Sequence, residues 1–381
     1  MVERKSVSLY KFSEMVLKIS LLVLAAACCL SCGEPPRKRP LHDRHSSLLD
    51  SIVLRPREEL TLVFSGDVMQ HLPQVMAALR KDGTYDYSNC FRYIRPFWEE
   101  ADWAIVNLET TLAERGPYSG YPRFASPKAL AEALHEAGVD VAALANNHCC
   151  DRGRVGIRTT VRTLDSLGVR YAGVYVDSLQ ARNVLMLTKN GFRVALLNAT
   201  YGTNGLPVPQ GTVVHAIDTV RMAEEVRRAR RDSAATHVVL FVHWGEEYQR
   251  QPNRDQRQLA EWCERQGIDA VIGSHPHVAQ PVDTARRVVW SLGNLVSNQR
   301  NRFQDGGLSV RLRIGRGRRP EIEVLPYWVW CPTEEGRRRY YVVPSYVPGP
   351  EIGMDSLANR TFERALEDNR RVAGAVNEVR L

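Results

Sequence analysis

Two histidines flank a proline in the segment Gly273-Ser-His-Pro-His277, and imidazoles so close together can bind a metal ion. The preceding run, residues 269–272, is apolar and reads as a buried strand that ends at the Gly-Ser turn. Because Pro276 disfavours the helical conformation at the residue before it, we expect His275 and His277 on a short extended segment. These two side chains are half of a metal site, so other parts of the chain must supply the rest.

Further metal-type side chains stand directly after other predicted strands: Asp67, Glu109, Asn147 with His148, and His243. Each alone has an ordinary explanation; a lone Asp67, for example, could simply cap a turn. Because ligands of open α/β sheets bind outside the carboxyl ends of the strands, we expect all of them at one edge. Carboxylate, amide and imidazole donors together suit Mn²⁺, Fe²⁺ or Zn²⁺. The sequence therefore predicts a site for one or two divalent ions.

The elements that must position these residues alternate between strand and helix. The predicted strands are 60–64, 103–106, 139–144, 171–173, 184–187, 193–198, 237–242, 269–272, 288–290, 308–314 and 321–327. The predicted helices are 127–138, with Ser126 as N-cap, then 154–167, 218–231, 255–266 and 357–376. This order predicts an α/β fold with mostly parallel central strands. The polar stretch 300–307 is a candidate lid.

The amino terminus reads as a targeting segment. Basic residues precede an apolar run that is too short for a comfortable membrane span, and small residues precede the cysteines. We expect a lipoprotein signal peptide over 1–32, lipidation at Cys32 and an exposed tether over 33–58, rich in proline and charge. A plain secretory signal is the alternative. These features predict an exported, lipid-anchored protein of the cell envelope.

The net charge is +8 and comes largely from arginine. The arginine runs are dispersed and are not interleaved with stacking aromatics, so we do not expect nucleic acid as a partner. A solvated surface, or attraction to anionic envelope polymers, is the better interpretation. The five cysteines after the leader have no regular spacing and predict no disulfide framework.

The polar segments taken together resemble the motif set of the CapA family of bacterial capsule-synthesis, or poly-γ-glutamate-synthesis, proteins, which are related to calcineurin-like metallophosphoesterases. The segments are Gly66-Asp67, Asn107-Leu-Glu109, Asn146-Asn-His-Cys-Cys-Asp-Arg-Gly153, His243-Trp-Gly-x-Glu-Tyr248, Gly273-Ser-His-Pro-His277 and Ser291-Leu-Gly-Asn294. The resemblance implies the four-layer α/β/β/α sandwich of metal-dependent phosphatases. We expect this CapA-like metallophosphatase-fold domain to cover residues 59–331, followed by a C-terminal extension over 332–381.

The resemblance also implies roles for single residues. Asp67 matches the first metal aspartate, Glu109 stands where a bridging aspartate would be, and the remaining implied ligands are Asn147, His243, His275 and His277. The two last histidines are expected to face different metal positions. Met69 occupies a position where the phosphoesterases carry a histidine ligand, and His71 has the wrong spacing to replace it.

Around these ligands, we expect His148 to transfer a proton and Asp151 to orient its imidazole. Glu246, or its neighbour Glu247, is a candidate acid or base. Arg123 and Asn294 are candidate substrate-binding residues, the first through a bidentate contact with a carboxylate.

The resemblance implies a protein of capsule or poly-γ-glutamate biosynthesis, a metal-dependent hydrolase or transferase acting on an anionic polymer, with other capsule-synthesis proteins as candidate partners. Two alternatives stay open. One is a non-catalytic scaffold that binds and exports polymer through a degenerate metal site. The other is a general metallophosphoesterase.

Overall fold

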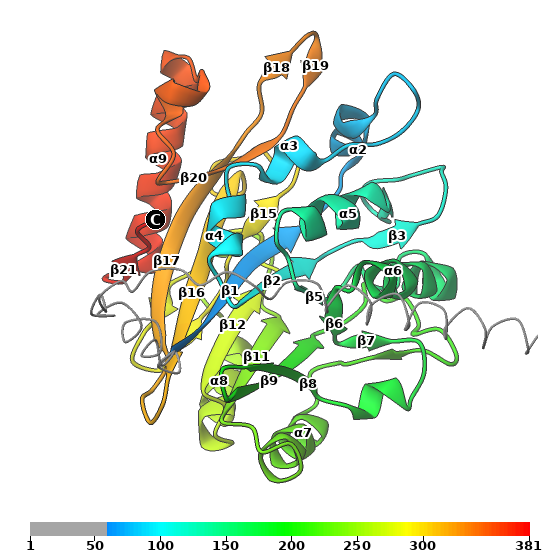
Figure 1. Ribbon diagram of the computed structural model, residues 1–381, viewed down its shortest axis with the longest axis vertical. Coiled ribbons are helices and arrows are strands. Elements are labelled where there is room, and N and C mark those ends of the chain that lie inside the picture. The colour runs from blue at the N-terminus through cyan, green and yellow to red at the C-terminus, as the bar shows by residue number, and fades with distance from the viewer. Residues whose placement is uncertain (1–58) are drawn as a thin grey trace, which may run out of the picture. The chain divides into compact units, whose positions relative to one another are not determined.

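The computed structural model describes residues 59–381 and contains two large β-sheets (Figure 1). The predicted signal peptide, Cys32 and the tether lie outside the described residues. The described residues belong to a single compact unit. Within them, no helix is both long and apolar enough to cross a membrane.

The larger sheet has β1 (Glu59–Val68) at its centre. On one side, parallel strands follow in the order β2 (Trp103–Leu108), β5 (Val141–Ala143) and β6 (Arg170–Ala172). On the other side, β16 (Gly306–Gly315), β17 (Glu321–Trp330) and β20 (Tyr341–Pro344) are antiparallel. The short strands β15 (Asn294–Val296) and β21 (Asn377–Glu378) run parallel to β1 and β17 respectively. The prediction of mostly parallel strands therefore holds for only one half of this sheet.

The second sheet has a parallel centre and antiparallel edges. Its order is β13 (Val282–Asp283), β14 (Val288–Val289), β12 (Ala270–Ser274), β11 (His237–His243), β9 (Phe192–Thr200) and β8 (Leu185–Lys189). The strands β14, β12, β11 and β9 are mutually parallel. Their carboxyl ends therefore point the same way, and β11 and β12 end at His243 and Ser274.

Apolar side chains join these sheets to each other and to the helices. One core combines residues of both sheets, among them Phe64 of β1 and Phe241 of β11, whose ring centroids lie 5.5 Å apart. A second core joins the larger sheet to α3 (Ser88–Phe91), α4 (Arg95–Glu99), α5 (Ala129–Glu136) and α6 (Gly153–Leu167). A third joins the smaller sheet to α7 (Thr219–Arg231) and α8 (Arg254–Arg265). The α/β fold class is confirmed.

Local sequence explains where the longer helices begin and end. The carboxylate of Asp218 accepts hydrogen bonds from the backbone of Val220 and Arg221 at the start of α7. At the start of α8, Asn253 and Gln256 cap each other's backbone N–H groups. Helix α6 ends at Gly168, whose φ of 72° is the left-handed conformation that glycine adopts easily.

The structure differs from the expected start of α5. Ser126 and Pro127 belong to a short strand, β4 (Ala125–Pro127), which pairs with β3 (Thr111–Ala113). The Ser126 hydroxyl contacts the Thr110 hydroxyl at 2.7 Å, so it is not available as a helix cap. The Ser-Pro pattern was outweighed by this pairing with a neighbouring segment.

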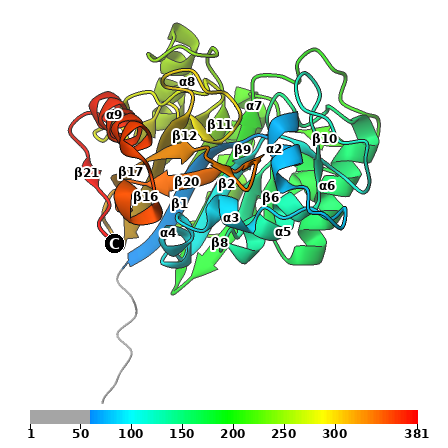
Figure 2. The same ribbon diagram turned by 90° about the horizontal axis from the view of Figure 1, so that it is seen from above.

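The last 50 residues extend the larger sheet and cover it. β20 and β21 both pair with β17, and α9 (Ser356–Ala373) runs beside β17 (Figures 1 and 2). Its Phe362 and Leu366 pack with Trp328, Tyr341 and Val343 in a separate small core. Residues 300–307 are held against α9, because Arg302 forms two hydrogen bonds with Asp368 of that helix, at 2.8 and 2.9 Å. These contacts argue against the prediction that residues 300–307 form a mobile lid.

Candidate metal centre

Four strands from the two sheets bring the metal-type side chains together. Asp67 lies within β1, Glu109 follows β2, His243 ends β11, and His275 and His277 follow β12. Asp67 Oδ2 lies 3.1 Å from His277 Nδ1, so the two sheets meet at this point. All five side chains are buried. The strand-end pattern thus delivers them to one place.

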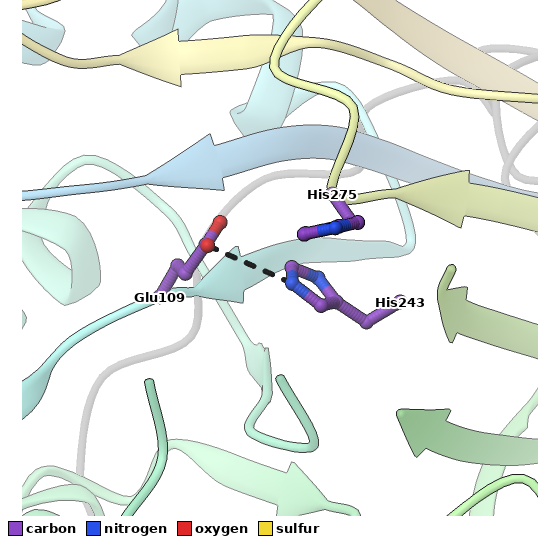
Figure 3. A group of neighbouring side chains, drawn as sticks. All are labelled: Glu109, His243 and His275. Carbon is purple, nitrogen blue, oxygen red and sulfur yellow. Dashed lines mark ion pairs between the residues drawn. The ribbon is translucent and has the colours of Figure 1, made fainter. Parts of the chain in front are cut away.

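The ligand atoms fall into groups that share residues. Glu109 lies with His243 and His275 in one group (Figure 3) and with Asp67 and His277 in another. Its Oε1 is 3.6 Å from His243 Nε2 and 3.8 Å from His277 Nε2. The structure therefore places Glu109 between two sets of ligands, while a third set joins His275 and His277 to Glu247.

Two buried atoms of this cluster have no hydrogen-bond partner among the described residues: Glu109 Oε1 and His275 Nδ1. A buried polar atom without a partner costs about 1–3 kcal/mol, so such atoms in a native site call for an explanation. A divalent cation explains both, because each atom has a lone pair that can coordinate it. The residues present therefore fit a metal ion.

Burial and like charge also shape the protonation of the cluster. Burial, followed by the negative charges of Asp67 and Glu247, raises the pKa of Glu109 well above its usual range. Burial, followed by the charge of His277, lowers the pKa of His275 to about 3. Burial, followed by the charge of His275, lowers the pKa of His243 as well. The imidazoles of His243 and His275 are thus held neutral, the form that binds metal, and a cation would favour ionised Glu109.

Asn147 joins the group around His243. Its Oδ1 lies 3.0 Å from His243 Nε2, so the amide oxygen and the ring nitrogen face the same space. His243 Nδ1 contacts the Ser274 hydroxyl at 3.0 Å, which can fix the ring orientation. Asn107 Nδ2 donates to Asp67 Oδ1 at 2.8 Å and to Glu109 Oε2 at 3.4 Å, and so holds the two carboxylates together.

His148 and Asp151 form a pair beside the cluster. His148 Nδ1 donates to Asp151 Oδ2 at 2.8 Å, and the same oxygen accepts the backbone N–H of Phe124 at 2.7 Å. The Phe124 ring stands edge-on to the imidazole, with centroids 4.6 Å apart. The charge of His148 contributes to the lowered pKa of both His243 and His275. His148 is therefore oriented by Asp151 and lies within electrostatic range of the cluster.

The backbone of the His-Pro-His segment differs from the extended conformation we expected. His275 has φ of 101° and His277 has φ of 57°. Non-glycine residues seldom adopt positive φ, and each such residue costs about 1–3 kcal/mol unless its surroundings compensate. The backbone N–H of His275, 3.4 Å from Asp67 Oδ2, and the Pro276 carbonyl, which accepts the N–H of Tyr248 at 2.7 Å, help to hold this conformation.

The two adjacent glutamates after β11 differ in position. The carboxylate of Glu247 groups with the ligand nitrogens of His275 and His277. Glu246 instead contacts the amide of Asn253 at 3.5 Å, at the start of α8. Glu247 is thus better placed than Glu246 to act at the metal centre.

The two candidate substrate-binding residues also differ. Arg123 is exposed and lines an open cleft next to Asp151. Asn294 is fully buried, and its Nδ2 donates to the carbonyl of His277 at 3.3 Å and to Gln299 and Gln304 at 2.8 Å. Asn294 therefore positions the loop that carries His277.

Two tyrosines flank the histidines, and sequence reasoning did not single them out. The ring of Tyr201 lies 4.5 Å from that of His275, and the ring of Tyr248 lies 6.2 Å from that of His277. Both side chains are nearly half exposed, so they stand between the buried ligands and solvent. Tyr201 directly follows β9, so the same strand-end rule could have found it. Asn107 and Ser274, within two residues of predicted ligands, could have been found by spacing.

Met69 and His71 lie close to the cluster. Met69 is buried, and its backbone N–H donates to Val296 at 3.0 Å. The Nδ1 of His71 accepts the backbone N–H of Asn298 at 3.3 Å, and its ring stands edge-on to Phe124. His71 is absent from the groups of side chains that could hold a metal among the described residues.

Comparisons with known proteins agree with this arrangement. Residues 61–299 match the family model described as bacterial capsule synthesis protein PGA_cap. The chain is 28% identical to the capsule biosynthesis protein CapA of Bacillus anthracis over 64% of this chain and 61% of that protein. It is 26% identical to the PGA biosynthesis protein CapA of Bacillus subtilis over 84% of this chain and 81% of that protein.

A third similar protein is a probable polyglutamine synthesis accessory protein of Mycobacterium tuberculosis, 24% identical over 52% of this chain and 56% of that protein. The chain therefore aligns with about three fifths of the Bacillus anthracis relative and with about half of the mycobacterial one. The matched family segment contains every residue of the metal cluster.

Proposed function

The chain belongs to the bacterial capsule synthesis protein family, PGA_cap, and we propose that it is a metal-dependent hydrolase or transferase of capsule or poly-γ-glutamate biosynthesis. Its substrate would be an anionic polymer of the cell envelope. The protein would be held at the envelope by a lipid on Cys32 and could act with other capsule-synthesis proteins. The names of the two CapA relatives support the biosynthetic role.

The observation that carries the catalytic part is the pair of unpartnered atoms, Glu109 Oε1 and His275 Nδ1, inside a buried cluster of carboxylates and imidazoles. A structural cluster without an ion would be expected to satisfy these atoms internally. The proposed ligands are Asp67, Glu109, Asn147, His243, His275 and His277. One or two Mn²⁺, Fe²⁺ or Zn²⁺ ions bound there would polarise the scissile group and make water a better nucleophile.

The chain's own groups would then orient the substrate and move protons. Asp151 holds His148 with a proton on Nδ1, so that Nε2 is the atom that can exchange a proton with the reacting group. Glu247 stands at the exposed side of His275 and His277, where it can accept a proton from an entering nucleophile. Tyr201 and Tyr248, beside the rings of His275 and His277, would limit access of water.

The test is metal analysis combined with activity. Protein purified without chelator should contain a divalent metal and should cleave a γ-glutamyl or a phosphodiester substrate when Mn²⁺, Fe²⁺ or Zn²⁺ is supplied. Glu109→Gln keeps the side-chain shape but removes the charge, so both metal affinity and activity should fall at least about tenfold. Glu264→Gln, at an exposed position on α8, is the matched control and should change neither. Metal-free wild-type protein that stays inactive with all three metals would refute the proposal.

The non-catalytic scaffold is the second candidate, and Met69 at a position where related enzymes carry a histidine favours it. Replacing His275 and His277 together by alanine separates the two in cells. A catalyst would lose polymer output, whereas a scaffold would retain it. Cleavage of phosphodiesters without any effect on γ-glutamyl polymer would favour a general metallophosphoesterase instead.

A further inference from the structure

An open cleft of about 870 Å³ lies beside the metal centre, and four arginines line it. It is formed by the end of β3, the Arg123 loop, the start of α6 and the loop after Leu206. The four residues are exposed and come from three separate segments: Arg115, Arg123, Arg152 and Arg154. We call this feature the arginine cleft.

None of the four guanidinium groups has an ion-pair partner or a side-chain hydrogen bond within residues 59–381. Elsewhere many arginines are paired; Arg313, for example, contacts Glu59 at 2.6 Å. The one exposed acidic residue of the cleft, Glu114, is already engaged by Lys128 at 2.8 Å. The cleft therefore concentrates uncompensated positive charge, which attracts anions.

The position of Arg152 and Arg154 strengthens this interpretation. They stand at the N-cap and in the first turn of α6, a helix of 15 residues with no acidic residue in its first turn. Positive charge at a helix N-terminus is unfavourable because the helix dipole is positive there. A bound anion would relieve both the dipole and the mutual repulsion of the arginines. The arrangement therefore favours an anion in the cleft.

The cleft is linked to the metal centre through Asp151. Asp151 lines the cleft and also accepts the hydrogen bond from His148 at 2.8 Å. A chain that passes through the cleft would therefore lie next to the proposed proton-transfer residue. Apolar side chains at the surface of the same cleft can contact the methylene groups of such a chain: Val155, Leu206, Pro207 and Pro209.

We propose that the arginine cleft is a binding subsite for a segment of a polycarboxylate polymer, adjoining the segment that occupies the metal centre. This rests on the proposed function for the identity of the reacting site, but the binding itself does not require turnover. Each guanidinium can bind a carboxylate through two parallel hydrogen bonds. The volume is at the upper end of small-molecule pockets, so several repeat units of a polymer can be accommodated.

The experiment measures binding of fluorescently labelled poly-γ-glutamate to the full-length chain. The triple variant Arg115→Gln, Arg152→Gln, Arg154→Gln should bind about tenfold more weakly and with a shallower salt dependence. The matched control, Arg265→Gln, Arg319→Gln, Arg360→Gln, removes the same charge from exposed positions that have no side-chain contacts among the described residues and lie outside the cleft. Equal weakening by both triple variants would show a general charge effect and would overturn the subsite.

Two further measurements separate this inference from the proposed function. Glu109→Gln should lose metal but keep polymer binding, so an inactive protein with cleft-dependent binding would refute only the proposed function. An active enzyme whose polymer binding is unaffected by the cleft variant would refute only the subsite. Inorganic polyphosphate or duplex DNA binding to the cleft as tightly as the polycarboxylate would overturn the assignment of the ligand class.

Discussion

Glu109 reaches both groups of ligands, so the number of metal ions depends on the residues that face it from either side. Around His243 the group has His275 and the amide oxygen of Asn147 as further donors. Among the described residues, the group that contains Asp67 and Glu109 has His277 as its one imidazole, since Met69 supplies no nitrogen. We therefore expect the two positions to differ in affinity, with the one at Asp67 the weaker.

Met69→His should strengthen that weaker position. Met69 lies two residues after Asp67, and the backbone N–H groups of both residues donate to the same neighbouring segment, Gly293 and Val296, at 3.0 Å each. An added imidazole there should raise the metal content measured by elemental analysis. Met76→His adds the same group at a position that is 56% exposed and is the control. Unchanged stoichiometry at saturating Mn²⁺ in both variants would contradict the expectation.

His215 gives a pH dependence outside the metal centre. Burial and the positive charges of Arg221 and Arg228 lower its pKa from 6.5 to about 3. Its Nδ1 lies 3.4 Å from Glu225, but that carboxylate is paired more closely with Arg221, at 2.6 Å. The folded state thus excludes a proton that the unfolded state binds below pH 6.5. The resulting stability is complete above the unfolded pKa and is lost as the pH falls toward the folded pKa, at about 1.4 kcal/mol for each pH unit.

The measurement is the free energy of unfolding in urea at pH 7 and pH 5. Between pH 7 and pH 5, the free energy of unfolding of the His215→Gln variant should fall less than that of the wild type. Parallel curves for the two proteins would contradict the lowered pKa.

At the scale of elements, close backbone contacts bring the strand ends together. A side chain at Gly273 would overlap the Trp290 carbonyl and the Trp244 indole nitrogen, which bond each other at 2.9 Å. At Gly66 a side chain would overlap the carbonyl of Gly293. Strand β1 can approach the segment that precedes β15, and β12 can approach Trp290, because these two positions have no Cβ.

Gly273→Ala should therefore destabilise the protein by about 1–3 kcal/mol or more, since the clash is with backbone rather than a flexible side chain. Gly202→Ala is the matched control, because a Cβ there meets nothing within 4 Å and its φ is not positive. Thermal unfolding of the two variants provides the comparison. Similar unfolding midpoints for the two variants would show that β12 and the Trp290 segment can move apart without loss of stability.

The local pattern identified the principal strands but not their ends. The apolar run 60–64 predicted β1, yet β1 continues to Val68 because Asp67 bonds Gly293 across the sheet. Likewise, Ser126 and Pro127 became a strand because β3 was available as a partner. Such pairings join residues far apart in sequence, so local composition cannot reveal them. The ligands were predictable because they stand at strand ends, as Tyr201 also does, whereas the choice of Glu247 over Glu246 needed the folded backbone.

At the scale of the whole described unit, the metal centre depends on residues beyond the family match. The matched segment ends at residue 299, but β16 is the antiparallel neighbour of β1, the strand that carries Asp67. Five residues after 299 are buried in the core between the sheets: Leu308, Val310, Leu312, Ile314 and Val324. The C-terminal part is therefore integral to the site.

A fragment of residues 59–299 should fail to fold. Burial of each of those five side chains contributes about 1.5–3 kcal/mol, and their sum approaches the 5–15 kcal/mol of a typical domain. Residues 59–381 are the control. Near-UV circular dichroism of the two fragments would report fixed tertiary packing, and a native spectrum from the shorter one would contradict this account.

The positive φ angles at His275 and His277 have an evolutionary consequence. Glycine would adopt either conformation without strain, so a search for thermostable variants could select exchanges at these two positions. Each such exchange would delete an imidazole from the cluster. Laboratory evolution under heat alone should therefore select more stable proteins that have lost histidines from this cluster. Selection that retains function must accept a local weakness in the loop after β12 and find its stabilising changes elsewhere.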